Sequence, residues 1–144
     1  CNFFKFYYPD LPSNRNGFAL KDLNQITLIN SDDNCCSYFE NVTSLDELKY
    51  FHNLRKINDY SFYNCRDLKS IIFPENLKVI QDNAFGGRNS LEELKFPENI
   101  QFIRKYAFCY CTSLKEIIIP ERFKDNMKYI FDEVNLTKVD IIYI

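Results

Sequence analysis

The sequence repeats itself with a 23-residue period. Three blocks abut without a gap, and they read NLRKINDYSFYNCRDLKSIIFPE (53–75), NLKVIQDNAFGGRNSLEELKFPE (76–98) and NIQFIRKYAFCYCTSLKEIIIPE (99–121). Their apolar positions coincide, and so does a small residue followed by Phe in the middle of each block. A unit of this size cannot bury its own apolar side chains, so it has to share a core with stacked copies of itself.

Two apolar patterns in each block predict its local structure. The first is L-x-x-I/L-x-F/I-P, which begins at Leu68, Leu91 and Leu114. Its last two apolar residues are two apart, as on one face of a strand, and the proline ends the strand because it cannot donate to the sheet. The second pattern, N-L/I-x-x-I, is expected to close the opposite side of the coil. The small residue and its Phe are expected on a tight turn or a short helical piece that fills the interior.

Weaker copies of the repeat lie on both sides of these blocks. One copy lies a full period before the first block, at Phe39, Leu45, Leu48 and Tyr50, and a further strand pattern ends at Leu28. Downstream, residues 126–130 echo the second pattern and residues 136–141 the first, with a shortened segment between them. A degenerate last repeat is typical of a capped solenoid end. We therefore predict one continuous domain, with an N-terminal cap and a partial first repeat over 1–29 and repeats over 30–144.

The pattern L-x-x-I-x-I-P-x-x-[LVI]-x-x-I-x-x-x-A-F-x-x-C, carried by residues 71–85 and 94–111, resembles the BspA-like leucine-rich repeat. The resemblance covers residues 30–121 best, weakens toward residue 144 and is absent before about residue 20. We therefore predict an α/β fold, a right-handed leucine-rich-repeat solenoid of about five coils. Its short parallel strands are joined by turns or short helical pieces. The cysteine position of the family falls on Arg88 in the middle block and on Val42 in the first copy, which counts against chemistry at that position.

The cysteines of the repeats are interpreted as part of the core. Cys65 and Cys111 occupy the same repeat position two coils apart, which places their backbones roughly 10 Å from each other. That distance exceeds the limit of about 7 Å for a disulfide. We expect both to be small apolar side chains in a core ladder, whose members are Phe39, Phe62, Phe85, Phe108, Cys65 and Cys111. A disulfide from Cys35 or Cys36 to another cysteine stays open for an oxidising compartment.

Cys1 has two interpretations. As a mature N-terminus it would carry a lipid that anchors the protein to a membrane. As part of the N-terminal cap, or as a mere boundary of the expressed segment, it would have no such role. The residues that follow it, NFFKFYY, are apolar and strand-like, unlike a flexible polar tether.

Composition and motifs argue against an enzyme and against several kinds of partner. The 18 basic and 20 acidic side chains nearly balance, so no electrostatic footprint for nucleic acid is present. The apolar runs are far shorter than the ~20 residues of a transmembrane helix. His52 is the only histidine, and no motif pairs it with a nucleophile. Neither G-x-S-x-G nor H-E-x-x-H occurs, and the C-x-C at 109–111 without a nearby histidine is a poor zinc signature. We predict no catalytic residue, metal or cofactor.

The outward positions of the predicted strands form the candidate protein-binding face. They are Glu47, Lys49, Ser70, Ile72, Glu93, Lys95, Glu116 and Ile118, continued by Lys138 and Asp140. One interpretation is a charged surface that keeps the protein soluble, with Ile72 and Ile118 as incidental exposed residues. The other is a mixed polar and apolar recognition strip, as on other extended solenoid faces.

The resemblance implies an exported or surface-attached protein of a bacterium or mucosal parasite, used for adhesion and protein contact. The function predicted here is a non-enzymatic binding module at the cell surface or outside the cell, whose ligand is a protein such as a host extracellular-matrix or surface protein. The alternative is a structural spacer or a fragment of a longer cell-surface protein. A screen for protein ligands separates the two.

Overall fold

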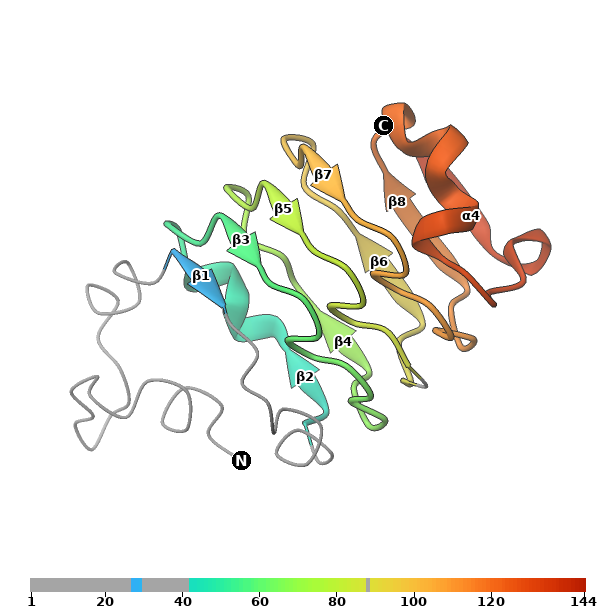
Figure 1. The fold of residues 1–144 in the computed structure, drawn as a ribbon, viewed down its shortest axis with the longest axis horizontal. Coiled ribbons are helices and arrows are strands. Elements are labelled where there is room, and N and C mark those ends of the chain that lie inside the picture. Colours follow the sequence, from blue (N-terminus) through green and yellow to red (C-terminus); the bar gives the residue numbers. More distant parts are fainter. Residues whose placement is uncertain (1–26, 30–41, 88) are drawn as a thin grey trace.

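Short parallel strands and few helices make up the part of the chain that the structure describes. The structure, a computed structural model, describes residues 27–29, 42–87 and 89–144 (Figure 1). Phe39, Cys1, Cys35, Cys36, Arg88 and most of the predicted N-terminal cap lie outside the described residues. Where the chain is described, its elements agree with an α/β repeat fold, and successive repeats lie side by side.

The strands form two rows, one on each side of the stack (Figure 1). The first row contains β2 (Ser44–Leu45), β4 (Ser70–Ile71), β6 (Glu93–Lys95), β8 (Glu116–Ile119) and β9 (Asp140–Tyr143). The second row contains β1 (Leu28–Ile29), β3 (Lys56–Ile57), β5 (Val79–Ile80) and β7 (Phe102–Ile103). The second row is a single hydrogen-bonded sheet, whereas the first divides into β2–β4 and β6–β8–β9. The far side of the coil, where the sequence predicted only a closing apolar pair, is therefore a parallel sheet of its own.

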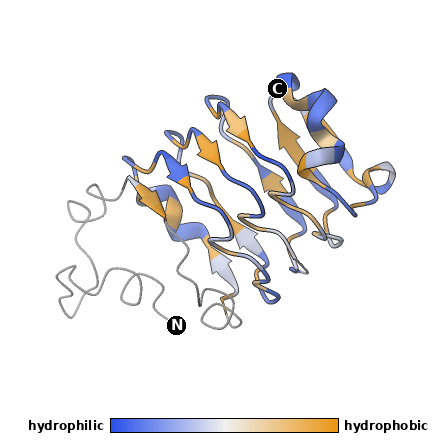
Figure 2. Ribbon diagram, in the orientation of Figure 1, coloured by the Kyte–Doolittle hydropathy of each residue, from blue (hydrophilic) through white to orange (hydrophobic). Residues whose placement is uncertain are grey.

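Every pairing between the described strands is parallel, and the pairings within the three central repeats follow the period of the sequence. Lys56 pairs with Val79 and Val79 with Phe102, while Glu93 pairs with Glu116, each exactly one period further along the chain. Alternate residues of these strands point inward, as the burial of Leu94, Ile117 and Ile119 shows. Figure 2 shows hydrophobic residues along β5, β7 and β8 and mostly hydrophilic residues in the turns that join the strands.

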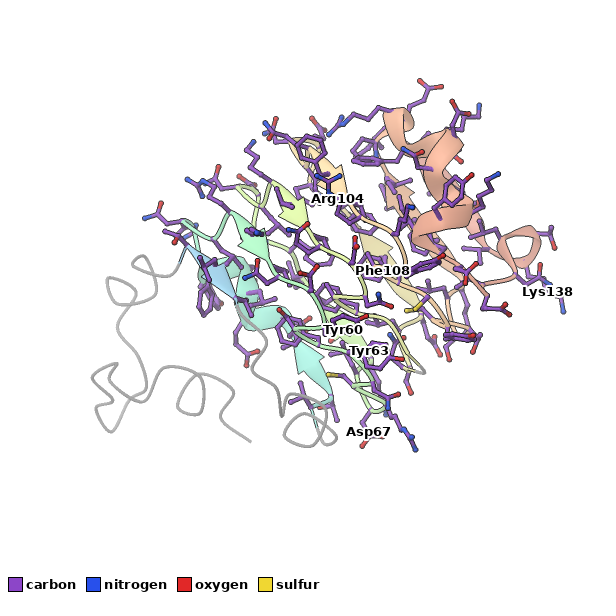
Figure 3. All side chains as sticks on the ribbon, in the orientation of Figure 1. Tyr60, Tyr63, Asp67, Arg104, Phe108 and Lys138 are labelled. Carbon is purple, nitrogen blue, oxygen red and sulfur yellow. The ribbon has the colours of Figure 1, made fainter. Side chains whose placement is uncertain are left out.

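The core between the two rows contains a column of stacked phenylalanines. Phe85 stacks on Phe62 at 5.0 Å between ring centroids and on Phe108 at 5.1 Å, with the rings nearly parallel. Phe131 continues the column at 5.6 Å from Phe108 (Phe108 is labelled in Figure 3). The sequence analysis missed Phe131, although it lies one repeat period after Phe108. Phe73 and Phe96 meet the column edge-on, so aromatic contacts tie the first row to it.

Helical pieces replace strands at two places. The 3-10 helix η1 (Asp46–Tyr50) follows β2, and it buries Leu48. At the other end, η2 (Glu121–Asn126) and α4 (Met127–Ile130) occupy the position that follows β7 in the second row (Figure 1). Tyr106 N–H donates to the carbonyl of Tyr129 and Phe108 N–H to that of Ile130, so the backbone contacts of the repeat continue onto α4. The last 3-10 helix, η3 (Leu136–Lys138), leads into β9.

The register of both terminal repeats differs from the sequence-based alignment. Leu45 pairs with Ile71, three positions further along than one period, so the assignment of Leu48 to that strand position is wrong. Ile117 pairs with Ile141, one position further along than the period. Leu28 pairs with Lys56 in the second row, so the strand that it ends does not belong to the first pattern. The extra residues after β2 lie in the segment that contains η1, and the one before β9 lies in the segment that contains η3. The apolar pattern carries no information about the length of these connections.

A left-handed residue recurs in the turn that precedes the phenylalanine of the three central repeats. Tyr60, Asn83 and Tyr106 have φ angles of 55°, 55° and 60°. Their N–H groups donate along the stack to Asp82, Lys105 and Tyr129, which joins neighbouring turns. Asparagine tolerates this conformation, whereas a bulky residue pays about 1–2 kcal/mol for it.

Tyr106→Asn is therefore expected to raise the free energy of unfolding by about 1 kcal/mol. The Tyr106 side chain is exposed, so little packing is lost. Chemical denaturation measures the change. Tyr129→Asn is the matched control, because Tyr129 is similarly exposed but lies in α4, and it should bring no gain. A loss of stability in Tyr106→Asn would contradict the explanation.

Candidate protein-binding face

Outward side chains of the first row form two parallel columns. Glu93, Glu116 and Asp140 are register partners on β6, β8 and β9. Two residues further along the same strands, Lys95, Ile118 and Ile142 are register partners as well. Ser70 and Ile72 hold the corresponding positions in the repeat before. We call these eight residues the first-row face; its columns are Ser70, Glu93, Glu116 and Asp140, and Ile72, Lys95, Ile118 and Ile142.

The structure places six of the eight predicted face residues on these strands and the other two on a helix. Glu47 and Lys49 were expected on a strand, and that expectation is wrong, because both lie in η1. Lys138 lies in η3, at the C-terminal end of the stack (Figure 3), and its predicted position belongs to Asp140. Ile142, which was not among the predicted residues, lies two residues after Asp140 on β9 and pairs with Ile118.

Exposure differs among the apolar residues of the face. Ile72 is 44% exposed and Ile142 is 40% exposed. Ile118, which was expected to be exposed, is half-buried between them. An apolar strip with polar neighbours is typical of an interaction surface.

The hydrogen-bonded ladder of the first row is interrupted between β4 and β6, although the two strands remain neighbours. β4 pairs with β2 and β6 pairs with β8, but no hydrogen bond joins β4 to β6 in the part of the chain that the structure describes. A groove of about 690 Å³ lies over these strands, and Ser70, Ile72, Glu93, Lys95, Glu116 and Ile118 line it. A second hollow of about 600 Å³ adjoins it and shares Ile72 and Lys95. The two hollows make the centre of the first-row face concave.

One end of the groove has a small polar network. The Ser70 Oγ lies 3.1 Å from both the Ser44 Oγ and the Asp46 Oδ2, and the Asp46 N–H donates to the Ser44 Oγ. Asp46 comes from η1, so the helix that replaced the expected strand brings a carboxylate to the edge of the face. No signal in the 23-residue pattern could have identified it, because the contact depends on the shifted register of β2.

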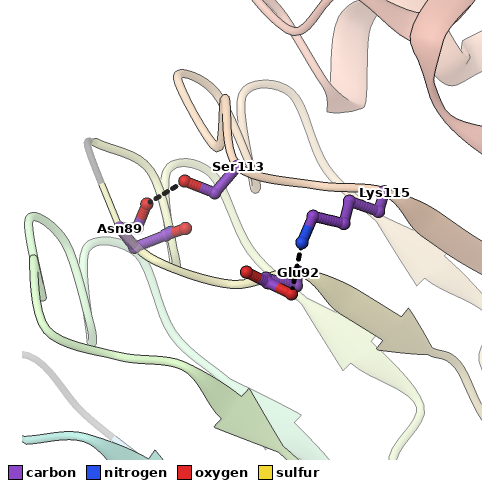
Figure 4. Close-up of polar contacts among 4 residues, drawn as sticks. All are labelled: Asn89, Glu92, Ser113 and Lys115. Carbon is purple, nitrogen blue, oxygen red and sulfur yellow. Dashed lines mark hydrogen bonds and ion pairs between the residues drawn. The ribbon is translucent and has the colours of Figure 1, made fainter.

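The charged side chains of the face are not neutralised by one another. Within the described ranges the only ion pair joins the Lys115 Nζ to the Glu92 Oε2 at 2.7 Å, beside the groove (Figure 4). Both side chains are more than half exposed, so this pair contributes little to stability. Figure 4 also shows the hydrogen bond from the Ser113 Oγ to the Asn89 carbonyl, which links the same two repeats. Glu93, Glu116 and Asp140 therefore present their carboxylates to solvent or to a ligand.

Two cysteines that the sequence singled out carry free, buried thiols, Cys109 and Cys111. The Asn89 Nδ2 donates to the Cys111 Sγ at 3.0 Å. Burial raises the pKa of the Cys111 thiol from its ordinary value of 9.0 to about 12, against the effect of the Asn89 hydrogen bond. Burial also raises the pKa of Cys109. A buried thiol that stays protonated is a poor nucleophile and a poor metal ligand.

The raised pKa of the Cys111 thiol makes the free energy of unfolding fall as the pH rises above 9. The unfolded chain releases the Cys111 proton near pH 9 and the folded chain only near pH 12. The stability that the protonated thiol contributes is therefore complete below pH 9, and it disappears as the pH rises toward 12. From about pH 8 to about pH 11, wild type is expected to lose roughly 2–3 kcal/mol more than Cys111→Ala. Urea denaturation at each pH measures this. From about pH 6 to about pH 8 the two proteins should differ by a constant amount, and parallel losses above pH 8 would refute the explanation.

His52 lies in a turn after η1 and lines the second hollow, and its carbonyl accepts hydrogen bonds from Arg55 and Asn76. Among the described residues no group of His, Cys, Asp and Glu converges on a position for a metal ion. No helix in those ranges has the length and apolar character to cross a membrane.

The comparison with protein families gives one match. A family model described as the BspA type leucine-rich repeat region matches residues 33–143 in six copies. The match spans the strands of the first row and all but β1 of the second. No curated protein and no solved structure matches the chain significantly.

Proposed function

Since the chain belongs to the BspA-type leucine-rich-repeat family, we propose that it is an exported, non-enzymatic module that binds a protein ligand through the first-row face. The repeats wind as a right-handed solenoid of about five coils. The parallel strand pairs support this, because crossovers between parallel strands are almost always right-handed. The N-terminal cap over 1–29 and the continuous repeat domain over 30–144 are part of the same proposal.

One observation carries the proposal: the concave centre of the first-row face, where the two hollows meet at Ile72 and Lys95. An exposed isoleucine in a hollow gives a ligand apolar surface to bury, and burial of a branched aliphatic side chain is worth about 1.5–3 kcal/mol. Neighbouring charges supply orientation and specificity. Repeat proteins use extended concave surfaces of this kind to bind macromolecules.

The proposed ligand is a host extracellular-matrix or surface protein, and the proposed location is the cell surface or the extracellular space. The family implies both, because BspA-type repeats are used in adhesion. A lipid on Cys1 would provide the anchor for a surface location, and mass spectrometry of native material tests it.

The test is capture of purified matrix proteins and mucins by the immobilised chain. We expect at least one to be retained, and Ile72→Ser to weaken its binding about 10-fold or more. Phe102→Ser is the matched control, because Phe102 is 49% exposed on the second row. It should leave binding unchanged. Retention of none of these proteins, or equal losses in both variants, would overturn the proposal.

A second candidate function, a spacer within a longer cell-surface protein, is favoured by β9. Its outer edge pairs with no strand among the described residues. The apolar side chains beside it, Leu136, Val139, Ile141 and Tyr143, are only partly buried. Such an edge can accept another repeat. A longer version of the chain that binds no ligand but has β9 protected from hydrogen exchange would support the spacer.

A further inference from the structure

We propose that the groove over the first-row face takes an extended, positively charged polypeptide segment in which basic and apolar side chains alternate. This inference rests on the proposed function and names the chemistry of its ligand. The basic side chains pair with Glu93, Glu116 and Asp140. The apolar side chains lie on Ile72, Ile118 and Ile142.

The carboxylates of Glu93, Glu116 and Asp140, which we call the acidic column, repel one another. Glu93, Glu116 and Asp140 are direct register partners on adjacent strands, so their backbones are about 4.8 Å apart. Like charges at such positions destabilise a sheet. None of the three forms an ion pair in the described structure. A ligand with positive charges relieves this repulsion on binding.

The groove as a whole carries more negative than positive charge. Its lining includes the carboxylates of Asp46, Glu92, Glu93 and Glu116 and the ammonium groups of Lys69 and Lys95. Lys115 pairs with Glu92, and Asp140 continues the acidic column beyond the groove. The unpaired carboxylates therefore outnumber the unpaired ammonium groups, and an acidic ligand would be repelled.

The arrangement of the carboxylates favours a polypeptide over a metal ion. They follow one another along the stack and do not converge, and among the described residues no three acidic groups could surround an ion. Three carboxylates on adjacent strands span about 10 Å. Alternate side chains of an extended peptide are about 6.7 Å apart, so two long basic side chains can reach all three.

The column of Ile72, Lys95, Ile118 and Ile142, which we call the apolar column, requires apolar side chains in the ligand. It runs parallel to the acidic column, two residues further along each strand. A peptide that lies flat between the columns directs alternate side chains to opposite sides. One side then meets carboxylates and the other meets Ile72, Ile118 and Ile142. Lys95 interrupts the apolar column, so a basic residue on this side of the peptide is disfavoured, in agreement with basic side chains that face the carboxylates.

The test uses a short synthetic peptide in which lysine and valine alternate. Fluorescence anisotropy compares it with a peptide of the same composition in separate blocks and with one that has glutamate for lysine. We expect the alternating basic peptide to bind most tightly, the block peptide to bind at least threefold more weakly, and the acidic peptide not to bind. Affinity should fall as salt is raised. Equal binding of the acidic peptide would overturn the inference.

Two sets of variants assign the binding to the acidic column. Affinity for the alternating peptide is expected to fall at least 10-fold in the triple variant Glu93→Gln/Glu116→Gln/Asp140→Asn. Asp67→Asn/Glu98→Gln/Asp125→Asn removes the same charge from exposed positions that do not line the groove, and affinity should stay within threefold. Equal losses would show a general charge effect and would refute the site. The first variant removes repulsion, so its thermal midpoint should not fall below that of wild type.

The outcomes also separate this inference from the proposed function. If a matrix protein is retained and Ile72→Ser weakens it, but the basic peptide does not bind, the protein-binding function stands and the inferred ligand chemistry is wrong. If the basic peptide binds and no matrix protein or mucin is retained, the chemistry of the groove stands and the proposed class of host ligand is wrong.

Discussion

Phe85→Ala is expected to lower the free energy of unfolding by about 3–5 kcal/mol. Phe85 is fully buried, and it stacks on Phe62 and Phe108 and meets Phe73 edge-on. Its removal leaves a cavity in the middle of the column, and the neighbouring rings are held by their own repeats and cannot close it. The loss also removes the ring that stacks on both Phe62 and Phe108.

Guanidinium denaturation of the variant measures this effect. Phe102→Ala provides the control, because Phe102 is a phenylalanine of the same chain that is 49% exposed on the outside of the second row. It should change stability by no more than about 0.5 kcal/mol. A loss below about 1 kcal/mol in Phe85→Ala would mean that the repeats do not share one core.

Asn89→Ala is expected to cost about 2–4 kcal/mol, the second largest effect. The buried Asn89 side chain satisfies backbone groups on both sides. Its Nδ2 donates to the Phe85 carbonyl at 3.1 Å, and its Oδ1 accepts from the Leu91 N–H at 3.3 Å. Alanine leaves the Leu91 N–H without this acceptor and the Phe85 carbonyl with only the weak Cys111 thiol donor, and a buried group that loses its hydrogen bond costs about 1–3 kcal/mol. The Cys111 Sγ also loses its contact with the amide.

Ser113→Ala is the control for Asn89→Ala. The Ser113 Oγ donates to the Asn89 carbonyl, but Ser113 is exposed, so water can replace the hydroxyl. The change should stay within about 0.5 kcal/mol, as is usual for a surface position. Similar effects of the two substitutions in denaturation experiments would show that the Asn89 amide has no special role.

The role of Asn89 shows where the sequence-based interpretation of the cysteines stopped. Burial of Cys65 and Cys111 follows from their common repeat position. The pattern treats the middle repeat as a departure, because Arg88 stands at the cysteine position. In the structure the next residue, Asn89, reaches into the core and donates to Cys111 of the following repeat. No spacing rule predicts that contact, since it joins two different repeat positions in adjacent repeats.

The candidate site was predictable in its middle and not at its ends. Ser70, Ile72, Glu93, Lys95, Glu116 and Ile118 follow from strict repetition, because every strand in the central repeats is a copy of its neighbour. Glu47 and Lys49 failed because the partner of β2 lies three positions later than the period requires. That shift is odd, and an odd shift moves each side chain to the other face of its strand. Ile142 was missed because the sequence alignment placed the last strand two residues too early, with Lys138 and Asp140 where the structure has Asp140 and Ile142.

The 23-residue period by itself determined the stacking of the repeats, the parallel pairing of their strands and the column of phenylalanines, because each apolar position is buried best against its own copy. Only the tertiary structure decided where this repetition ends. It set the register of β2 and β9, put α4 in place of a strand and interrupted the hydrogen bonding of the first row between β4 and β6. The physical reason is that loop length and local hydrogen bonding decide these features. The periodic burial of side chains constrains neither of them.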